Sequence, residues 1–169
     1  AHAEAAARSD RLRIVNCFSR TPESRESYRD RHGIPVACSS VEELLADRLV
    51  EAVVVSTPND LHVAHAIACL EAAKPVLVDK PVAVDASEGL ELMRSADACG
   101  VAVGVAHHAR RLAGIRSAKR WIDWGEAGRV RLANANFSNN RGVSISPDAW
   151  HRSARGSEAG VLIQVGIHQ

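Results

Sequence analysis

Short apolar runs alternate along the chain with longer segments of mixed polarity. The runs are rich in Val and Ile, and turn-forming or helix-capping residues bound each of them. They predict strands over residues 12–18, 35–38, 51–56, 75–78 and 101–105. Three consecutive valines at 53–55 are typical of a strand that is buried on both faces.

The segments between these runs carry helix signals. Gly33 is a natural stop for a helix over residues 22–32, and Ser40 with Glu43 forms a capping pair that opens residues 41–46. Further helices are predicted from Asn59 onward, from Asp85 to about Gly100 with Glu88 completing the cap, and over residues 111–123. Strands separated by helices imply right-handed crossovers and a parallel sheet. We therefore predict an α/β fold, a doubly wound parallel sheet, over residues 1–128.

The pattern changes after Gly128. Residues 129–138 alternate polar and apolar positions, which predicts a strand covered on one face, and residues 160–168 have helical potential. We interpret residues 129–169 as the opening of a second, α+β domain. Both ends of the sequence look cut, so we also expect a longer parent protein in which the rest of the second domain follows this chain.

The charge balance and the apolar pattern exclude several function classes. The formal charge is +1, from 21 basic and 20 acidic residues, and the basic residues are scattered, which disfavours nucleic-acid binding. The sequence contains no run of about 18 apolar residues, so no membrane span is predicted. No signal-peptide pattern is present, so we expect a cytoplasmic protein. The cysteines are widely spaced and predict buried, reduced thiols rather than a zinc site or disulfides: Cys17, Cys38, Cys69 and Cys99.

Polar and charged residues follow the predicted strands, where ligands bind in open α/β sheets. They are Ser19 and Arg20, then residues 56–59, then Asp79 and Lys80, and finally His107 and His108 with Arg110 and Arg111 nearby. Lys80 comes directly after an apolar strand and before Pro81. A lysine there can donate a proton or a hydrogen bond to a substrate oxygen, and partial burial would lower its pKa. The alternative is a solvated lysine paired with a neighbouring acid.

Ser19 and Arg20 bear on the choice of cofactor. In dinucleotide folds an acidic residue at this strand end binds the ribose 2′-OH of NAD, whereas an arginine accommodates the 2′-phosphate of NADP. Neither position is acidic here, which predicts NADP, with NAD possible. A surface arginine in a loop is the alternative.

Two pairs of side chains have helical spacing. Gln164 and His168 are four residues apart and share one helix face, so His168 could transfer a proton near neutral pH, or the pair could satisfy hydrogen bonds in a core. For His62 and His65 we favour packing or capping, and no metal site is predicted.

Four motifs together carry a family resemblance. STPNDLH at 56–62, VDKP at 78–81, GEAGRV at 125–130 and GVLIQVGIHQ at 160–169 resemble motifs of the Gfo/Idh/MocA family of NAD(P)-dependent oxidoreductases. Asp79 stands where that family usually has glutamate in its EKP tripeptide, and Gln164 stands where many members have aspartate.

The resemblance implies that a first strand and a Gly-rich phosphate loop precede this chain in the parent protein. It also implies a role for each matching position. Lys80 would be the catalytic lysine near the nicotinamide, His168 the acid–base histidine and Gln164 a residue that orients substrate. The remaining positions would contact the cofactor: Ser19 and Arg20 at the adenosine ribose, Ser56, Thr57, Pro58, Asn59, His62 and Asp79 along it, and Arg110 near the nicotinamide side.

The leading hypothesis is a dehydrogenase or reductase that moves a hydride between nicotinamide and a sugar, cyclitol or related alcohol or ketone. Lys80 and His168 would handle the hydroxyl proton, and we expect a small-molecule substrate and a homo-oligomeric whole protein. An alternative, motivated by Gln164, is a non-catalytic dinucleotide-binding sensor on the same fold. A third is an unrelated doubly wound domain, which would bind no dinucleotide.

Overall fold

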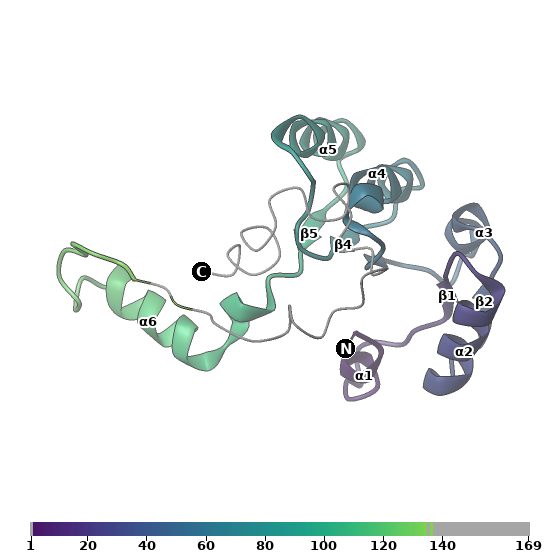
Figure 1. The fold of residues 1–169 in the computed structure, drawn as a ribbon, viewed down its shortest axis with the longest axis horizontal. Helices are drawn as coiled ribbons and strands as arrows, with labels where there is room; N and C mark the ends of the chain where they lie inside the picture. The colour runs from purple at the N-terminus through teal and green to yellow at the C-terminus, as the bar shows by residue number, and fades with distance from the viewer. Residues whose placement is uncertain (1, 135, 137–169) are drawn as a thin grey trace.

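The computed structural model describes residues 2–134 and residue 136, and its helices and strands alternate along the chain (Figure 1). The strands are β1 (Asn16–Phe18), β2 (Val36–Cys38), β3 (Val53–Val55), β4 (Val76–Val78) and β5 (Val103–Val105). The α-helices are α1 (His2–Ala6), α2 (Pro22–His32), α3 (Val41–Ala46), α4 (His62–Glu71), α5 (Ala86–Cys99) and α6 (Ala113–Asp123). Two 3-10 turns, η1 (Asn59–Leu61) and η2 (His108–Arg111), precede α4 and α6.

All described strand pairs are parallel, which confirms the predicted fold class. β1 pairs with β2 in one sheet, and β4 lies between β3 and β5 in another. A single sheet was expected, but none of the described residues bridges β1 and β3.

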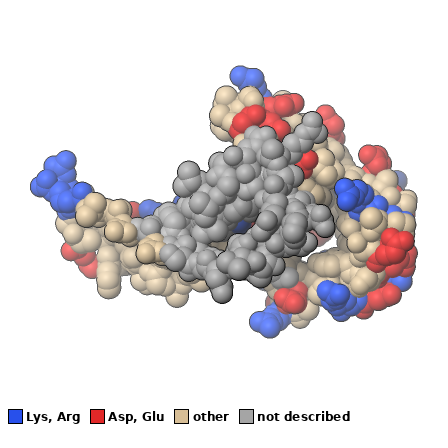
Figure 2. Space-filling view, viewed as in Figure 1, with Lys and Arg blue, Asp and Glu red and all other residues tan. Residues whose placement is uncertain are grey.

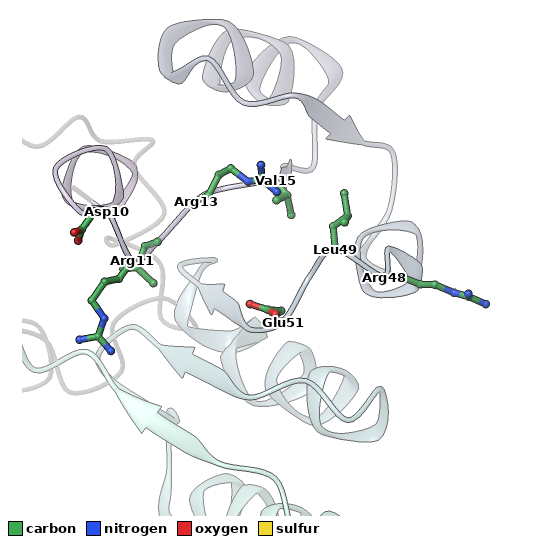
Figure 3. Close-up of a pocket in the computed structure, with 8 residues that line it drawn as sticks. Asp10, Arg11, Arg13, Val15, Arg48, Leu49 and Glu51 are labelled. Atoms are coloured by element: carbon green, nitrogen blue, oxygen red, sulfur yellow. The ribbon is translucent and has the colours of Figure 1, made fainter.

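A hollow of about 350 Å³ lies between the segments that lead into β1 and into β3 (Figure 3). Residues 10–13 and Val15 line one side of it, and residues 48, 49 and 51 line the other. The chain therefore enters β1 and β3 at this end of the sheets, and the carboxyl ends of the parallel strands point away from it. Arg11 and Arg48 extend in opposite directions in Figure 3, so their charges do not converge on one ligand position.

Side-chain caps fix the starts of the helices as the sequence predicts, with one difference of register. Ser40 Oγ accepts a hydrogen bond from Glu43 N at 3.1 Å, and Asp85 Oδ1 accepts one from Glu88 N at 2.9 Å. The return bond of each capping box comes from one residue earlier than the usual donor. Ser39 N donates to the Glu43 carboxylate at 2.7 Å, and Val84 N donates to the Glu88 carboxylate at 3.2 Å.

The core lies between α4, α5 and one face of the β3–β4–β5 sheet. Its most buried members come from these elements: Val55, Val63, Ala66, Cys69, Leu70, Val76, Val78 and Leu92. The prediction that β3 is buried on both faces is wrong for Val54, which is 48% exposed. Successive residues of a strand face opposite sides, and α4 covers only the side that Val53 and Val55 face.

Three further sequence predictions differ from the structure. Asn59 does not cap α4 but begins η1, and Leu61 holds the position before the helix. Residues 129–134 and residue 136, the described part of the strand predicted over 129–138, form no strand and pair with none of the described strands. The helix predicted from residue 111 begins at Ala113, after η2.

The thiol prediction holds in part. All four cysteines are free; Cys38 and Cys69 are buried, Cys17 is half-buried and Cys99 is exposed on the last turn of α5. Burial raises the pKa of the Cys69 thiol to about 11, which keeps it protonated and unreactive at neutral pH.

Acidic and basic residues are intermixed on the face that Figure 2 shows, in keeping with the near-zero net charge. Of the helices that the structure describes, none has the length and apolar character required to cross a membrane.

Leu70→Ala should lower the free energy of unfolding by about 2–5 kcal/mol, because Leu70 is only 1% exposed and its loss leaves a cavity. Leu90→Ala is the matched control on α5, where Leu90 is 50% exposed, and should cost less than about 0.5 kcal/mol. Urea unfolding followed by circular dichroism measures both. Equal losses in the two variants would contradict this assignment of the core.

Candidate functional site at the carboxyl ends of the strands

Strand register brings three strand ends to one level. Val55, Val78 and Val105 are partners across the sheet. The ladder continues one step beyond them, because Asp79 N donates to Val55 O and Ala106 N donates to Val78 O, each at 2.8 Å. The residues that follow the three strands therefore share one edge of the sheet.

The first part of this edge is the turn after β3, formed by residues 56–59. Ser56 is exposed, Thr57 and Pro58 are half-buried, and Asn59 is 3% exposed. Leu61 N donates to Pro58 O at 2.9 Å, which closes η1 and directs the chain into α4. The turn thus places polar groups at the edge of the sheet, while Asn59 at its end is buried.

Lys80 lies after β4 at the same edge and is half-buried. Burial lowers the pKa of its ammonium group, and the carboxylate of Asp79 opposes that change. Asp79 Oδ1 also accepts a hydrogen bond from Lys80 N at 2.9 Å, and the Lys80–Pro81 peptide bond is cis. A lysine whose pKa is shifted toward neutrality can exchange a proton with a substrate oxygen, as the sequence predicts for Lys80.

His62 joins the turn after β3 to the turn after β4. The residue is 1% exposed, with ring Nδ1 2.7 Å from Pro81 O and ring Nε2 2.8 Å from Thr57 O. The packing expected from its spacing is present, but the sequence gives no sign of the two carbonyl partners, since they lie 19 and 5 residues away.

His65, one turn further along α4, also reaches the first turn. Its Nδ1 lies 3.2 Å from Thr57 Oγ1. Burial lowers the pKa of His65, the neighbouring His62 lowers it further, and Glu42 opposes both effects. Two histidines therefore anchor Thr57, one at its carbonyl and one at its hydroxyl.

Ser19 and Arg20 follow β1, in the other sheet. Ser19 is half-buried and Arg20 is exposed. The next residue, Thr21, caps α2 by accepting a hydrogen bond from Ser24 N at 3.3 Å. A hydroxyl and a guanidinium at a strand end are suited to a phosphate group.

The other predicted site residues are less closely tied to this edge. Arg110 is exposed in η2, beyond β5. Gln164 and His168 lie outside the described residues. Within the described part of the chain, no group of three or more His, Cys, Asp or Glu side chains could hold a metal ion. The structure thus brings together residues 56–59, His62, Asp79 and Lys80.

A family model described as an oxidoreductase family with an NAD-binding Rossmann fold, GFO_IDH_MocA, matches residues 1–107. The chain belongs to the Gfo/Idh/MocA family. The matched residues include β1 to β5 and all of residues 56–80, so family membership rests on the segment that forms the candidate site.

Curated members of the family resemble nearly the whole chain. A 1,5-anhydro-D-fructose reductase from Ensifer adhaerens is 32% identical, over 92% of this chain and 46% of its own length. An NADP(+) scyllo-inositol 2-dehydrogenase from Bacillus subtilis, IolW, is 31% identical over 89% of this chain and 40% of its own length. The chain therefore spans about half the length of the curated relatives it matches.

Solved structures agree with this membership. A protein described as an NADPH-dependent oxidoreductase from Desulfitobacterium hafniense is 33% identical with a TM-score of 0.90, covering 99% of this chain and 48% of its own. The WlbA dehydrogenase from Bordetella pertussis, in complex with NADH and UDP-GlcNAcA, is 30% identical with a TM-score of 0.71, covering 76% of this chain and 37% of its own.

Amine labelling should find Lys80 reactive at lower pH than an ordinary lysine, because only the neutral amine reacts and burial lowers the pKa of Lys80. The chain has three lysines, Lys74, Lys80 and Lys119, so peptide mass spectrometry can follow each one separately. The midpoint of labelling is the pH at which half of the maximal reactivity is reached. Asp79→Asn should lower this midpoint for Lys80 further, since it removes the charge that favours the ammonium form. A midpoint for Lys80 at or above that of free lysine would contradict the assigned environment.

Proposed function

We propose that the protein is an NAD(P)-dependent dehydrogenase or reductase that acts on a CH–OH group of a sugar, a cyclitol or a related alcohol. The observation that carries the proposal is the half-buried Lys80, with its lowered pKa, at the strand edge that it shares with residues 56–59. Membership of an NAD-binding oxidoreductase family supplies the reaction class. The names of the two curated relatives support a sugar-like or polyol substrate.

The residues present fit a dinucleotide. Ser19 and Arg20 would hold the adenosine ribose and a 2′-phosphate. Neither residue is acidic, so neither would repel that phosphate. Residues 56–59 and Asp79 would line the cofactor near Lys80. We propose NADP as the preferred cofactor, which agrees with the NADP(+) and NADPH in two relatives' descriptions, whereas WlbA in complex with NADH supports NAD as the alternative.

The bound cofactor would supply the hydride chemistry. In the oxidation direction neutral Lys80 would accept the proton of the substrate hydroxyl, and in reduction the ammonium form would return it. His168 would share this proton transfer and Gln164 would orient the substrate; both belong to residues 129–169, which we propose to open the substrate domain.

Arg20→Ala should weaken NADPH binding about tenfold or more and leave NADH binding within about twofold. A charged hydrogen bond to phosphate contributes about 1.5–3 kcal/mol, and NADH has no 2′-phosphate. Arg31→Ala, at the other end of α2, is the matched control and should change neither affinity. Tryptophan quenching gives both dissociation constants. Equal weakening of NADPH and NADH would remove Arg20 from 2′-phosphate recognition.

Lys80→Ala should reduce kcat by about 10²–10⁴-fold, the usual contribution of a positioned proton-transfer group, with NADPH affinity nearly unchanged. Lys119→Ala is the control, because Lys119 is exposed and pairs with Asp123 on α6. Polyols and keto-sugars are assayed by absorbance at the nicotinamide band. Unchanged turnover in the Lys80 variant would remove the lysine from the mechanism. Cofactor binding by the wild-type protein with no turnover of any substrate would favour a non-catalytic sensor.

A further inference from the structure

We propose that His62 is a positioning residue that ties the turn after β3 to the turn after β4 and so sets the position of Lys80 against the cofactor-lining residues. The proposal rests on the proposed function for its catalytic consequence. It assigns His62 an indirect role, in place of the direct cofactor contact that the family resemblance implies.

The burial of His62 argues against direct contact with a ligand. The residue is 1% exposed, so its ring presents almost no surface to a bound molecule. Both of its nitrogens lie against backbone carbonyls that belong to the chain itself. The polar capacity of the ring is therefore used within the fold.

The two partners place His62 where the proposed chemistry depends on it. Pro81 O belongs to the residue directly after Lys80, and Thr57 O belongs to the turn proposed to line the cofactor. His62 is also the first residue of α4, whose other end packs in the core. The ring thus connects both turns to the most buried helix of the described structure.

Carbonyl oxygens only accept hydrogen bonds, so each ring nitrogen needs its own hydrogen to bind its partner. A neutral imidazole has one N–H and can bind one carbonyl, whereas an imidazolium has two and can bind both. Other titratable groups lie near these two links. His65 contacts the same turn at Thr57 Oγ1, and Glu42 raises the pKa of His65. Asp79 and Lys80 precede Pro81 in the chain. A buried or half-buried carbonyl left without its donor would be destabilised, which gives each of the two links its own energetic weight.

Two substitutions separate the links. Asparagine places its amide nitrogen near the position of Nδ1, so His62→Asn can retain the bond to Pro81 O and lose the one to Thr57 O. Glutamine places its amide nitrogen near Nε2, so His62→Gln can retain Thr57 O and lose Pro81 O. Val63→Ala is the matched control, because Val63 is a buried neighbour on α4 that serves the core.

His62→Gln should reduce kcat on the order of tenfold with the cofactor dissociation constant within about twofold, since a small misplacement of a reacting group is costly. His62→Asn should keep kcat nearer the wild-type value and weaken cofactor binding instead. Val63→Ala should lower the melting temperature and leave the ratio of kcat to cofactor affinity unchanged.

Amine labelling of Lys80 gives a readout that does not depend on activity. Release of Pro81 in His62→Gln should expose Lys80 and move its labelling midpoint toward that of an ordinary lysine, whereas His62→Asn and Val63→Ala should leave the midpoint in place. Identical labelling of Lys80 in wild type and His62→Gln, equal kinetic losses in the two His62 variants, or loss of folding in both would overturn the proposal. The labelling shift in His62→Gln, together with a wild-type protein that neither binds a dinucleotide nor turns over substrate, would overturn the proposed function and leave the link between the turns intact.

Discussion

The candidate site depends on the in-register parallel pairing of β3, β4 and β5. Because Val55, Val78 and Val105 are partners, the polar residues after each strand emerge at one level rather than staggered along the sheet. A slip of one residue would move Asp79 and Lys80 relative to residues 56–59 and would turn every side chain of the strand to the opposite face. The core between the sheet, α4 and α5 holds this register, so the packing of apolar residues determines where the polar ones meet.

Burial then gives the edge its chemistry. Lys80 is withdrawn from water far enough that its pKa falls, while Asp79 beside it limits the change. His62 is withdrawn almost completely, and its ring serves two backbone carbonyls instead of solvent. The two side chains illustrate different uses of a nitrogen-bearing group that is partly or almost wholly withdrawn from water. One is left able to exchange a proton, and the other holds two turns together.

The sequence predicted what depends on local patterns. Valine-rich runs, Gly33 and the Ser40 and Asp85 caps predicted the strands and helices near their observed places, and the position of Lys80 after a buried strand predicted its lowered pKa. What depends on distant partners was not predicted. The exposure of Val54 follows from which face α4 covers, and the bond from His62 to Pro81 spans 19 residues. The roles of Gln164 and His168 remain predictions of the family resemblance.

The most direct test of the account is a crystal structure of the protein grown with NADP⁺. The account predicts that the nicotinamide lies at the carboxyl edge of β3 and β4, within reach of Lys80 Nζ, and that the adenosine ribose lies at Ser19 and Arg20. The His62 ring would remain between Thr57 O and Pro81 O. A dinucleotide bound elsewhere, for example in the hollow between Arg11 and Arg48, would contradict the claim that the strand ends form the cofactor site.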